Sequence, residues 1–344
     1  MVNAVPDPWV ARGLCGFEFR TGGGEPVRLF GNAHAGGLRA RIEGIMGSGE
    51  SQVFFQLLLS GLIVGGIYGL VALGFVLIYK ATNVVNFAQG ELMMLGAYFC
   101  YHLISSYQIP FLPAFLMTLL FSSMLGVLIE LAILRPLVGK TTFSVIMVTV
   151  GLATLLRSLV GLIWGHDHHA FPSPFSGEAI HFLGLVILPV ELATLGAAFL
   201  LFALCFLFFR FSKLGVAMRA TAFNQKYAFL MGISVRKIFS LSWVMASVVA
   251  SIGGILFASI SVLDSNMSFI GLKVFPAVVL GGIDSIGGAI VGGLVVGLAE
   301  SLSGGYLSQM FGSGVKELAA FFVLLLALMI RPYGLFGKKE IIRV

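Results

Sequence analysis

Charged residues are scarce in this chain, and the shortage limits what the protein can be. Only 10% of the 344 residues are Asp, Glu, Lys or Arg, whereas 58% are hydrophobic and the mean hydropathy is +1.01. These polar groups are too few to coat a water-soluble globule of this length. The composition therefore predicts an all-α, polytopic integral membrane protein in the bilayer.

Motifs for bound nucleotide, metal or covalent catalysis are also missing. The sequence has no G-x-x-x-x-G-K-[ST] phosphate loop, no H-E-x-x-H and no G-x-S-x-G. Its three cysteines, Cys15, Cys100 and Cys205, lack a C-x-x-C spacing. The run "HDHH" at 166–169 is interpreted as a solvated loop, because metal ligands usually converge from several elements. We therefore expect no metal, no cofactor bound by this chain and no enzymatic activity.

Residues 1–50 differ in composition from the rest of the chain. They contain five Arg and no Lys, many Gly, and no apolar run long enough for a signal sequence. Met46 lies shortly before the first apolar segment, so residues 1–45 are interpreted as an upstream extension of an overlong reading frame. The alternative is a disordered tail. We expect the folded domain over 51–338 and a short tail over 339–344.

Long apolar segments follow, each judged against the roughly 20 residues that cross a bilayer. About eight are expected, at 54–79, 92–108, 111–134, 143–164, 182–209, 238–263, 272–303 and 316–330. The seventh is interrupted by "GGIDSIGG" at 281–288, where four Gly and an Asp would not continue a helix in lipid. Two alternatives remain for it: a re-entrant hairpin of two half-spans, or one full, Gly-rich span.

Basic residues gather in the connections between apolar segments. They occur at position 80, at 135–140, at 210–237 and at 331–343. The positive-inside rule places these connections and the C-terminus on the cytoplasmic side. The net charge of +6 is thus explained by membrane topology, and we expect no nucleic-acid partner.

Glycines four residues apart predict closely packed helices. Small residues let two helix backbones approach each other in the membrane. We assign a packing role and no chemistry to these glycines: Gly61, Gly65 and Gly69 in the first segment, and Gly288, Gly292, Gly293 and Gly297 in the seventh.

Polar residues interrupt the apolar sequence at "NVVNFAQGELMMLGAY", residues 83–98. An unsatisfied polar group in hydrocarbon costs on the order of several kcal/mol, so these side chains need partners or water. They either cap the second segment, with Glu91 complementing the helix dipole, or line a pathway. Of the basic residues, Arg157 alone is expected deep in a segment, and we interpret it as snorkelling to an interface.

The connection over 209–237 is the longest basic one. It predicts a short amphipathic helix, flanked by Arg219, Lys226 and Arg236. A helix that does not span needs a partner or the membrane surface. From the chemistry alone, docking to a cytoplasmic protein and lying in the membrane interface are equal alternatives.

Four blocks in order carry a resemblance to a known family. They are "GLIVGGIYGLVALGFVLIYKATNVVNFAQGELMMLGAY", "RATAFNQKYAFLMGISVRKI", "FPAVVLGGIDSIGGAIVGGLVVGLAE" and "RPYGLFGKKE". Together they closely resemble the permeases of branched-chain amino acid ABC importers, the LivH-type family, over roughly residues 54 to 340. The resemblance implies a transport subunit in the bacterial cytoplasmic membrane.

The resemblance also implies partners and site residues. The partners are a second, LivM-type permease, two cytoplasmic ATPase subunits that bind ATP, and a periplasmic substrate-binding protein. A pathway role is carried over to Asn83, Asn86, Gln89, Gly90 and Glu91. Coupling to the ATPases is carried over to Arg219, Ala220, Ala222, Asn224, Ala228, Gly232 and Ile233.

Leucine, isoleucine and valine are the expected cargo, with urea, amides, other amino acids and aromatic acids as alternatives. A self-sufficient secondary carrier and a passive channel are the competing functions. A secondary carrier usually needs ionisable residues inside the membrane, and this sequence has few. An intramembrane enzyme lacks a paired nucleophile and base.

Overall fold

The structure is a computed structural model that describes residues 50–137, 140–175, 177–182, 185–312, 314–331 and 334–337. All of them belong to one compact unit, residues 48–344. The interpretations of residues 1–45 and of the tail over 339–344 lie outside the described residues.

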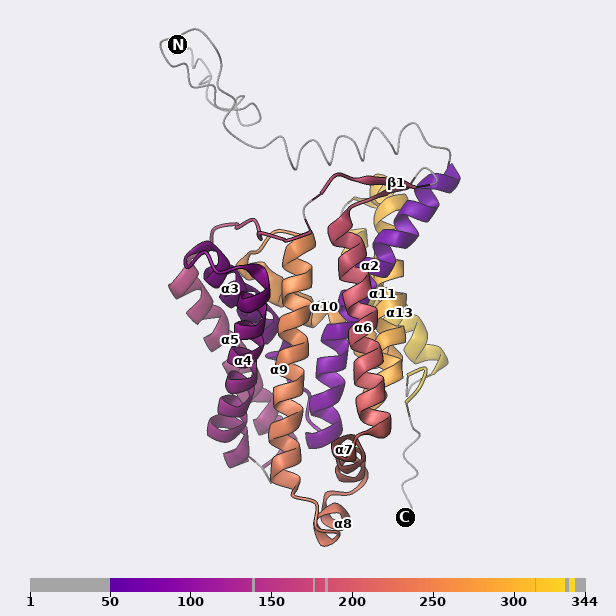
Figure 1. Cartoon of the computed structure of the whole chain (residues 1–344). Helices are drawn as coiled ribbons and strands as arrows, with labels where there is room; N and C mark the ends of the chain where they lie inside the picture. The colour runs from indigo at the N-terminus through magenta and orange to yellow at the C-terminus, as the bar shows by residue number, and fades with distance from the viewer. Residues whose placement is uncertain are drawn as a thin grey trace, which may run out of the picture. The chain divides into compact units, whose positions relative to one another are not determined.

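The described chain is a helical bundle, which confirms the expected fold class (Figure 1). Among the described residues, six helices are long and apolar enough to cross a bilayer. The main helices are α2 (Glu50–Thr82), α3 (Gln89–Ser105), α4 (Phe111–Ile129), α5 (Thr142–Trp164), α6 (Pro189–Phe211), α9 (Val235–Ile260), α10 (Ile270–Gly281), α11 (Ile286–Tyr306) and α13 (Val315–Ile330).

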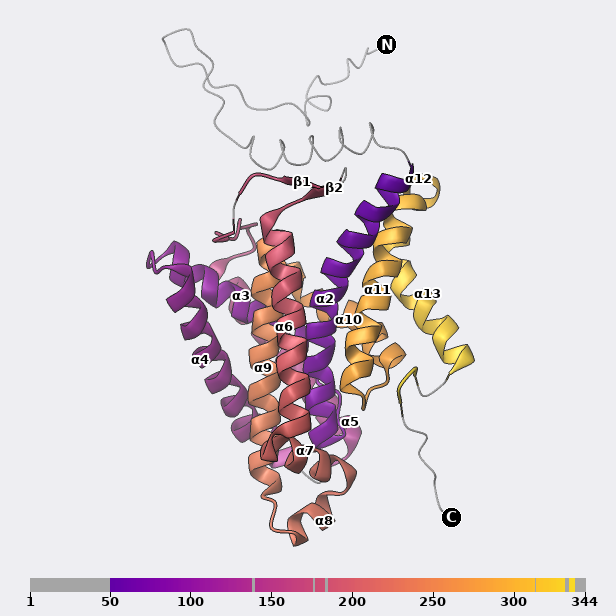
Figure 2. The same ribbon diagram turned by 45° about the vertical axis from the view of Figure 1, so that its right-hand side comes forward.

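Helix α2 lies at the centre of the bundle. Its residues from Ile67 to Ile78 are almost all buried, which explains why it is apolar on every side. Figure 2 shows α10, α11 and α13 together on one side of α2, with α3 and α4 on the other. Helix α9 packs against α2, α3 and α4 and thereby joins the two sides.

Short elements cover the two ends of the bundle (Figure 1). Helices α7 (Lys213–Phe223) and α8 (Gln225–Leu230) lie at one end, and we call residues 212–234 the connector. A hairpin of β1 (Ile180–Phe182) and β2 (Leu185–Ile187) lies at the other end. Helix α12 (Ser308–Phe311) lies at the same end as the hairpin, and the 3-10 turn η3 (Ser265–Phe269) packs against α3 and α5.

The hairpin corrects one boundary. The apolar segment expected over 182–209 does not begin as a helix, because β1 and β2 pair antiparallel with His181 opposite Val186. The Gln56 amide of α2 donates to the Val186 carbonyl at 2.9 Å and accepts from the Val186 N–H at 3.2 Å. Helix α6 starts only at Pro189, a residue whose fixed φ suits the first helical position.

Glycines bring α2 and α11 into backbone contact. A Cβ added at Gly297 would lie 2.3 Å from the Gly65 Cα, and one added at Gly293 would lie 2.3 Å from the Gly69 nitrogen. Gly61 faces Leu298 and Ser301 in the same interface, so the two helices run antiparallel. The Ser301 hydroxyl also donates to the Leu57 carbonyl at 2.7 Å.

The interrupted seventh segment is a hairpin of α10 and α11. Gly281 faces Gly288 and Ala277 faces Gly292, so these two helices are antiparallel as well. Gly282 has a φ of 102° in the turn between them, a conformation that favours glycine.

The two arms of this hairpin are unequal. Helix α10 has 12 residues and so is about 18 Å long, too short to cross a bilayer. The 21 residues of α11 are sufficient, which corrects the expectation of two half-spans. Only α10 is therefore the re-entrant arm.

Candidate functional site

The connection between α2 and α3 turns sharply at an asparagine. Asn83 has a φ of 56°, a left-handed conformation that asparagine tolerates better than most residues. Asn86 then fixes the chain ahead of α3. Its Oδ1 accepts from the Ala88 N–H at 3.0 Å, and its amide nitrogen donates to Gln89 Oε1 at 3.4 Å. The polar residues of this segment thus bond first to one another.

Gln89 lies inside the bundle and is fully buried. Its amide nitrogen donates to the Ala246 carbonyl of α9 at 3.2 Å. The side chain passes over Gly74 of α2, where an added Cβ would lie only 1.9 Å from Gln89 Nε2. Gln89 therefore connects α3 to α9 through a gap that only a glycine leaves open.

Gly90 is a contact point between α3 and α10. A Cβ added there would lie 2.1 Å from the Ser268 carbonyl oxygen and 3.0 Å from the Gly271 Cα. Any side chain at this position would push the re-entrant helix away from α3. Gly90 thus sets the distance between the polar segment and the short arm of the hairpin.

Glu91 forms an ion pair with Arg157 of α5. The Arg157 Nη2 to Glu91 Oε1 distance is 2.5 Å, and the Glu91 side chain is 3% exposed against 34% for Arg157. The guanidinium also lies 4.2 Å from the centroid of the Phe269 ring, a cation–π geometry. The sequence did not predict that Arg157 is paired with a carboxylate of α3, and its snorkelling to an interface stays a prediction.

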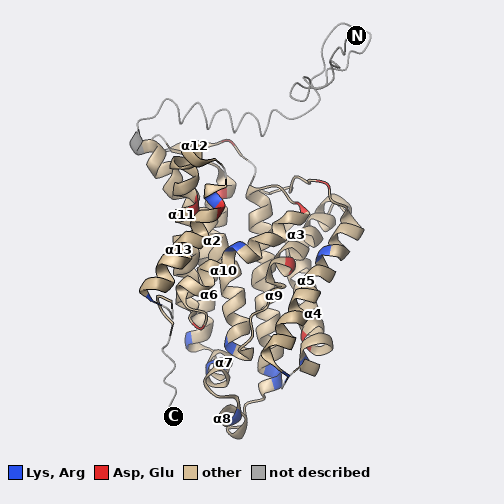
Figure 3. Cartoon of the chain, turned by 180° about the vertical axis from the view of Figure 1, so that it is seen from behind, with Lys and Arg blue, Asp and Glu red and all other residues tan. Residues whose placement is uncertain are grey.

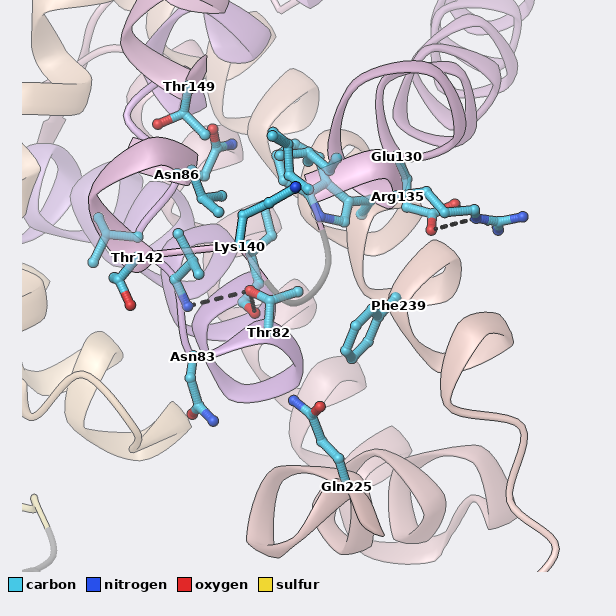
Figure 4. Close-up of a pocket in the computed structure, with 17 residues that line it drawn as sticks. Thr82, Asn83, Asn86, Glu130, Arg135, Lys140, Thr142, Thr149, Gln225 and Phe239 are labelled. Atoms are coloured by element: carbon cyan, nitrogen blue, oxygen red, sulfur yellow. Dashed lines mark hydrogen bonds and ion pairs between the residues drawn. The ribbon is translucent and has the colours of Figure 1, made fainter. Parts of the chain in front are cut away.

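A cavity of about 190 Å³ opens on the side of the bundle that carries α8, and we call it the α8-side cavity (Figure 4). It lies between the end of α2, the connection to α3, the end of α4, the start of α5, and helices α8 and α9. Its polar lining includes Asn83, Asn86, Lys140, Thr142, Thr149 and Gln225. Two of the expected pathway residues, Asn83 and Asn86, therefore line it, whereas Gln89, Gly90 and Glu91 lie among the helix contacts described above.

One wall of the α8-side cavity is fixed by a buried carboxylate. Glu130 begins the π-helical turn η1 (Glu130–Leu134), and Arg135 begins the 3-10 turn η2 (Arg135–Leu137). Arg135 donates to both Glu130 oxygens, at 3.1 and 2.9 Å, and the Ser240 hydroxyl donates to Glu130 Oε2 at 2.7 Å. Since Ser240 belongs to α9, this network joins the end of α4 to α9.

The connector consists of two helices where the sequence predicted one. Asn224 has an extended backbone between α7 and α8, and its side chain accepts from the N–H groups of Lys226 and Tyr227 at 2.9 and 3.1 Å. Asparagine favours this N-cap position, which ends one helix and starts the next. Gly232, with a φ of 83°, ends α8, and the Ile233 N–H donates to the Ala228 carbonyl.

The connector exposes large apolar side chains that sequence reasoning missed. Arg219 is exposed, Ala228 is buried and Ala220 and Ala222 are half-buried, so the alanines do not form its outer surface. Phe223 and Met231 are 88% and 85% exposed, and we call the patch made of Phe223, Tyr227, Phe229, Leu230 and Met231 the connector patch. The sequence signal for this exposure was that these apolar residues lie among basic residues in a short helix.

The connector contacts the end of α2. The Gln225 amide donates to the Ala81 carbonyl at 3.5 Å, a long bond, two residues before Asn83. Figure 4 shows Gln225 rising from α8 toward the cavity, opposite Thr82 and Asn83. Helix α8, which carries most of the connector patch, thus contacts the end of the helix that leads into the polar segment.

The chain is similar to known transport proteins. Residues 57–331 match the family model described as "Branched-chain amino acid transport system / permease component". The high-affinity branched-chain amino acid transport system permease protein LivH of Salmonella typhimurium is 30% identical, covering 85% of this chain and 98% of that protein. The corresponding BraD protein of Pseudomonas aeruginosa is 32% identical, with the same coverage. A probable LivH protein of Methanocaldococcus jannaschii is 28% identical, covering 82% and 92%.

Proposed function

Because this chain belongs to the family of branched-chain amino acid transport permease components, we propose that it is a membrane-spanning subunit of an ABC importer for leucine, isoleucine and valine. The single observation that best supports the mechanism is the connector. It exposes an apolar patch at the end of the bundle and contacts, through Gln225, the last turn of the helix that leads into the polar segment. An exposed apolar surface of this kind is typical of a protein–protein contact.

ATP binding and hydrolysis take place on two partner subunits in this proposal. The connector patch docks into an ATPase, and the turn at Gly232 and the cap at Asn224 keep α8 in a fixed orientation. Ala228 is the buried residue of α8, and Ala220 and Ala222 lie half-buried in α7, so small side chains there let the connector lie close to the bundle. Arg219 is exposed and available to an acidic partner group.

The α8 side of the bundle faces the cytoplasm in this proposal. Figure 3 shows Lys and Arg around α7, α8 and the adjacent helix ends, which agrees with the positive-inside rule. The C-terminus is then cytoplasmic, and the β1–β2 end faces the periplasm, where a substrate-binding protein delivers the cargo. A second, LivM-type permease completes the membrane domain. Asn83 and Asn86 line the cytoplasmic end of the pathway.

Reconstitution tests this function directly. The chain is co-expressed with the second permease, the two ATPases and the binding protein encoded beside it, and uptake of radiolabelled leucine, valine, urea and benzoate into proteoliposomes is measured. We expect leucine and valine uptake that requires ATP and the binding protein. Preferential uptake of urea or benzoate would contradict the assigned cargo. Uptake that continues without the ATPases would show that the protein is a secondary carrier or a channel and not an importer subunit.

A second measurement tests the docking surface. Phe229→Ser and Met231→Ser remove apolar area from the connector patch, and we expect both to reduce co-purification of the ATPases with the membrane subunits. Leu272→Ser, an exposed leucine on α10 outside the connector, is the matched control and should leave the ATPases bound. If all three variants retain the ATPases equally, the connector patch is not part of the interface with the ATPases.

A further inference from the structure

Lys140, an exposed residue, is one of two basic residues that line the α8-side cavity, and the Glu130 carboxylate of the same lining is bonded to the other one, Arg135. Lys140 lines the same cavity and forms no ion pair with any residue that the structure describes. Figure 4 shows its ammonium group reaching into the space between Asn86 and the Glu130–Arg135 pair.

Apart from the Glu130–Arg135 pair, the lining of the α8-side cavity consists of neutral polar groups and apolar walls. Asn83 and Asn86 carry amide oxygens, and the Asn86 oxygen, which accepts one bond from Ala88, has a second lone pair. The remaining wall is aliphatic and aromatic. Its apolar members include Val84, Val85, Leu134, Val145, Phe239 and Trp243.

The cavity suits a small ligand. Its volume of about 190 Å³ is below the roughly 300–1,000 Å³ of pockets for drug-sized molecules. A ligand that satisfies this lining needs a carboxylate for Lys140, a donor for the asparagine oxygens, and a short apolar side chain. A free aliphatic amino acid has all three.

We propose that the α8-side cavity is a product site, in which the imported amino acid binds before it leaves for the cytoplasm. Lys140 holds its carboxylate, the amide oxygens of Asn83 and Asn86 accept from its ammonium group, and Val84, Val145 and Leu134 contact its side chain. This inference rests on the proposed function and assigns a residue outside the recognised motif, Lys140, to recognition of the cargo.

The site also adjoins the connector. Gln225 lines the cavity and donates to the Ala81 carbonyl, so a bound amino acid lies next to the contact between α8 and α2. The product thus occupies the space between the polar segment and the part of the chain proposed to meet the ATPase.

Equilibrium binding tests the product site. The complete transporter, without its binding protein, is placed in lipid nanodiscs and titrated with radiolabelled leucine. Lys140→Gln removes the charge, and Val145→Trp fills the cavity from the apolar wall. Lys237→Gln is the matched control, since Lys237 is exposed at the start of α9 and is outside the cavity lining.

We expect Lys140→Gln to weaken leucine binding by about tenfold to a hundredfold, the usual effect of losing a charged hydrogen bond. Val145→Trp should also weaken binding, and Lys237→Gln should bind as the unchanged protein does. Leucinol, which lacks the carboxylate, should compete poorly against leucine. The compound 4-methylpentanoate, which keeps the carboxylate and lacks the ammonium group, should compete better than leucinol.

Several results would overturn the product site. Unchanged leucine binding by Lys140→Gln would do so, as would equal competition by leucinol. Native mass spectrometry that finds an anionic lipid lost in Lys140→Gln, with leucine binding intact, would assign the cavity to a lipid headgroup instead. The same variants are also reconstituted into proteoliposomes and assayed for leucine uptake with the binding protein present. If leucine is taken up but its binding does not depend on Lys140, the product site is rejected and the proposed function stands. If leucine is not taken up at all, the proposed function is rejected.

Discussion

Glu91 and Arg157 are 66 residues apart in the sequence, yet they form a 2.5 Å ion pair between α3 and α5. Each is an isolated charge in an apolar helix. Arg157 lies seven residues, about 10 Å, before the end of α5, one of the helices long and apolar enough to cross a bilayer. An ionised group there is costly unless it is paired, and the pairing explains how both residues are accommodated.

Removing one member of this pair should destabilise the bundle more than removing both. Arg157→Met leaves the 3%-exposed Glu91 carboxylate without its partner. We expect a loss below the about 3–5 kcal/mol typical of broken buried pairs, because Arg157 is one-third exposed. The double variant Glu91→Gln with Arg157→Met should recover part of that loss. Thermal unfolding in detergent of both single variants and the double variant measures the coupling, and strictly additive losses would show that the pair contributes nothing.

Adding a single methyl group to the contact between α2 and α11 should strongly destabilise the protein. In Gly297→Ala the new Cβ would lie 2.3 Å from the Gly65 Cα, which is backbone and cannot rotate away. We expect at least the about 1–3 kcal/mol of ordinary overpacking. Gly196→Ala, in α6, is the control, since an added Cβ there has no neighbour within 4 Å. Thermal midpoints of the purified variants in detergent should separate them, and equal midpoints would argue against the close contact.

Gly74 and Gln89 should behave as a coupled pair. Gly74→Ala places a methyl group where the Gln89 amide passes, so we expect it to break the bond to the Ala246 carbonyl and to lower both stability and uptake. In the background of Gln89→Ala, the same Gly74→Ala change should cost much less, because the obstructing amide is gone. A double-mutant cycle of melting temperatures measures this, and an unchanged cost of Gly74→Ala would contradict the geometry.

Proline in α7 should separate ATP hydrolysis from transport. Ala222 lies in the last turn of α7, where proline still removes a helical hydrogen bond and its ring clashes with the preceding turn. We expect Ala222→Pro to abolish ATPase stimulation by loaded binding protein, while the membrane subunits still assemble. Ala222→Ser keeps the helix and serves as the control. Normal stimulation in the proline variant would show that α7 does not transmit the coupling.

The sequence by itself determined the membrane class, the approximate spans and the glycine faces. Composition and apolar length suffice for the first two, since a bilayer demands about 20 apolar residues per helix. Gly61, Gly65 and Gly69 were identified from spacing alone, because a four-residue period puts them on one side of a helix. The turn at Gly282 was also readable, since a Gly-rich run does not continue a helix in lipid.

The tertiary structure decided which polar residues meet. The spacing of charges does not reveal that Arg157 finds Glu91, because α3 and α5 are brought together only by packing over the whole bundle. Burial of Gln89 depends on the gap at Gly74, a residue on another helix, and the cavity around Lys140 exists only where six elements converge. Local sequence specifies helices through local hydrogen bonds and apolar periods, whereas a site assembled from distant residues depends on how those helices pack.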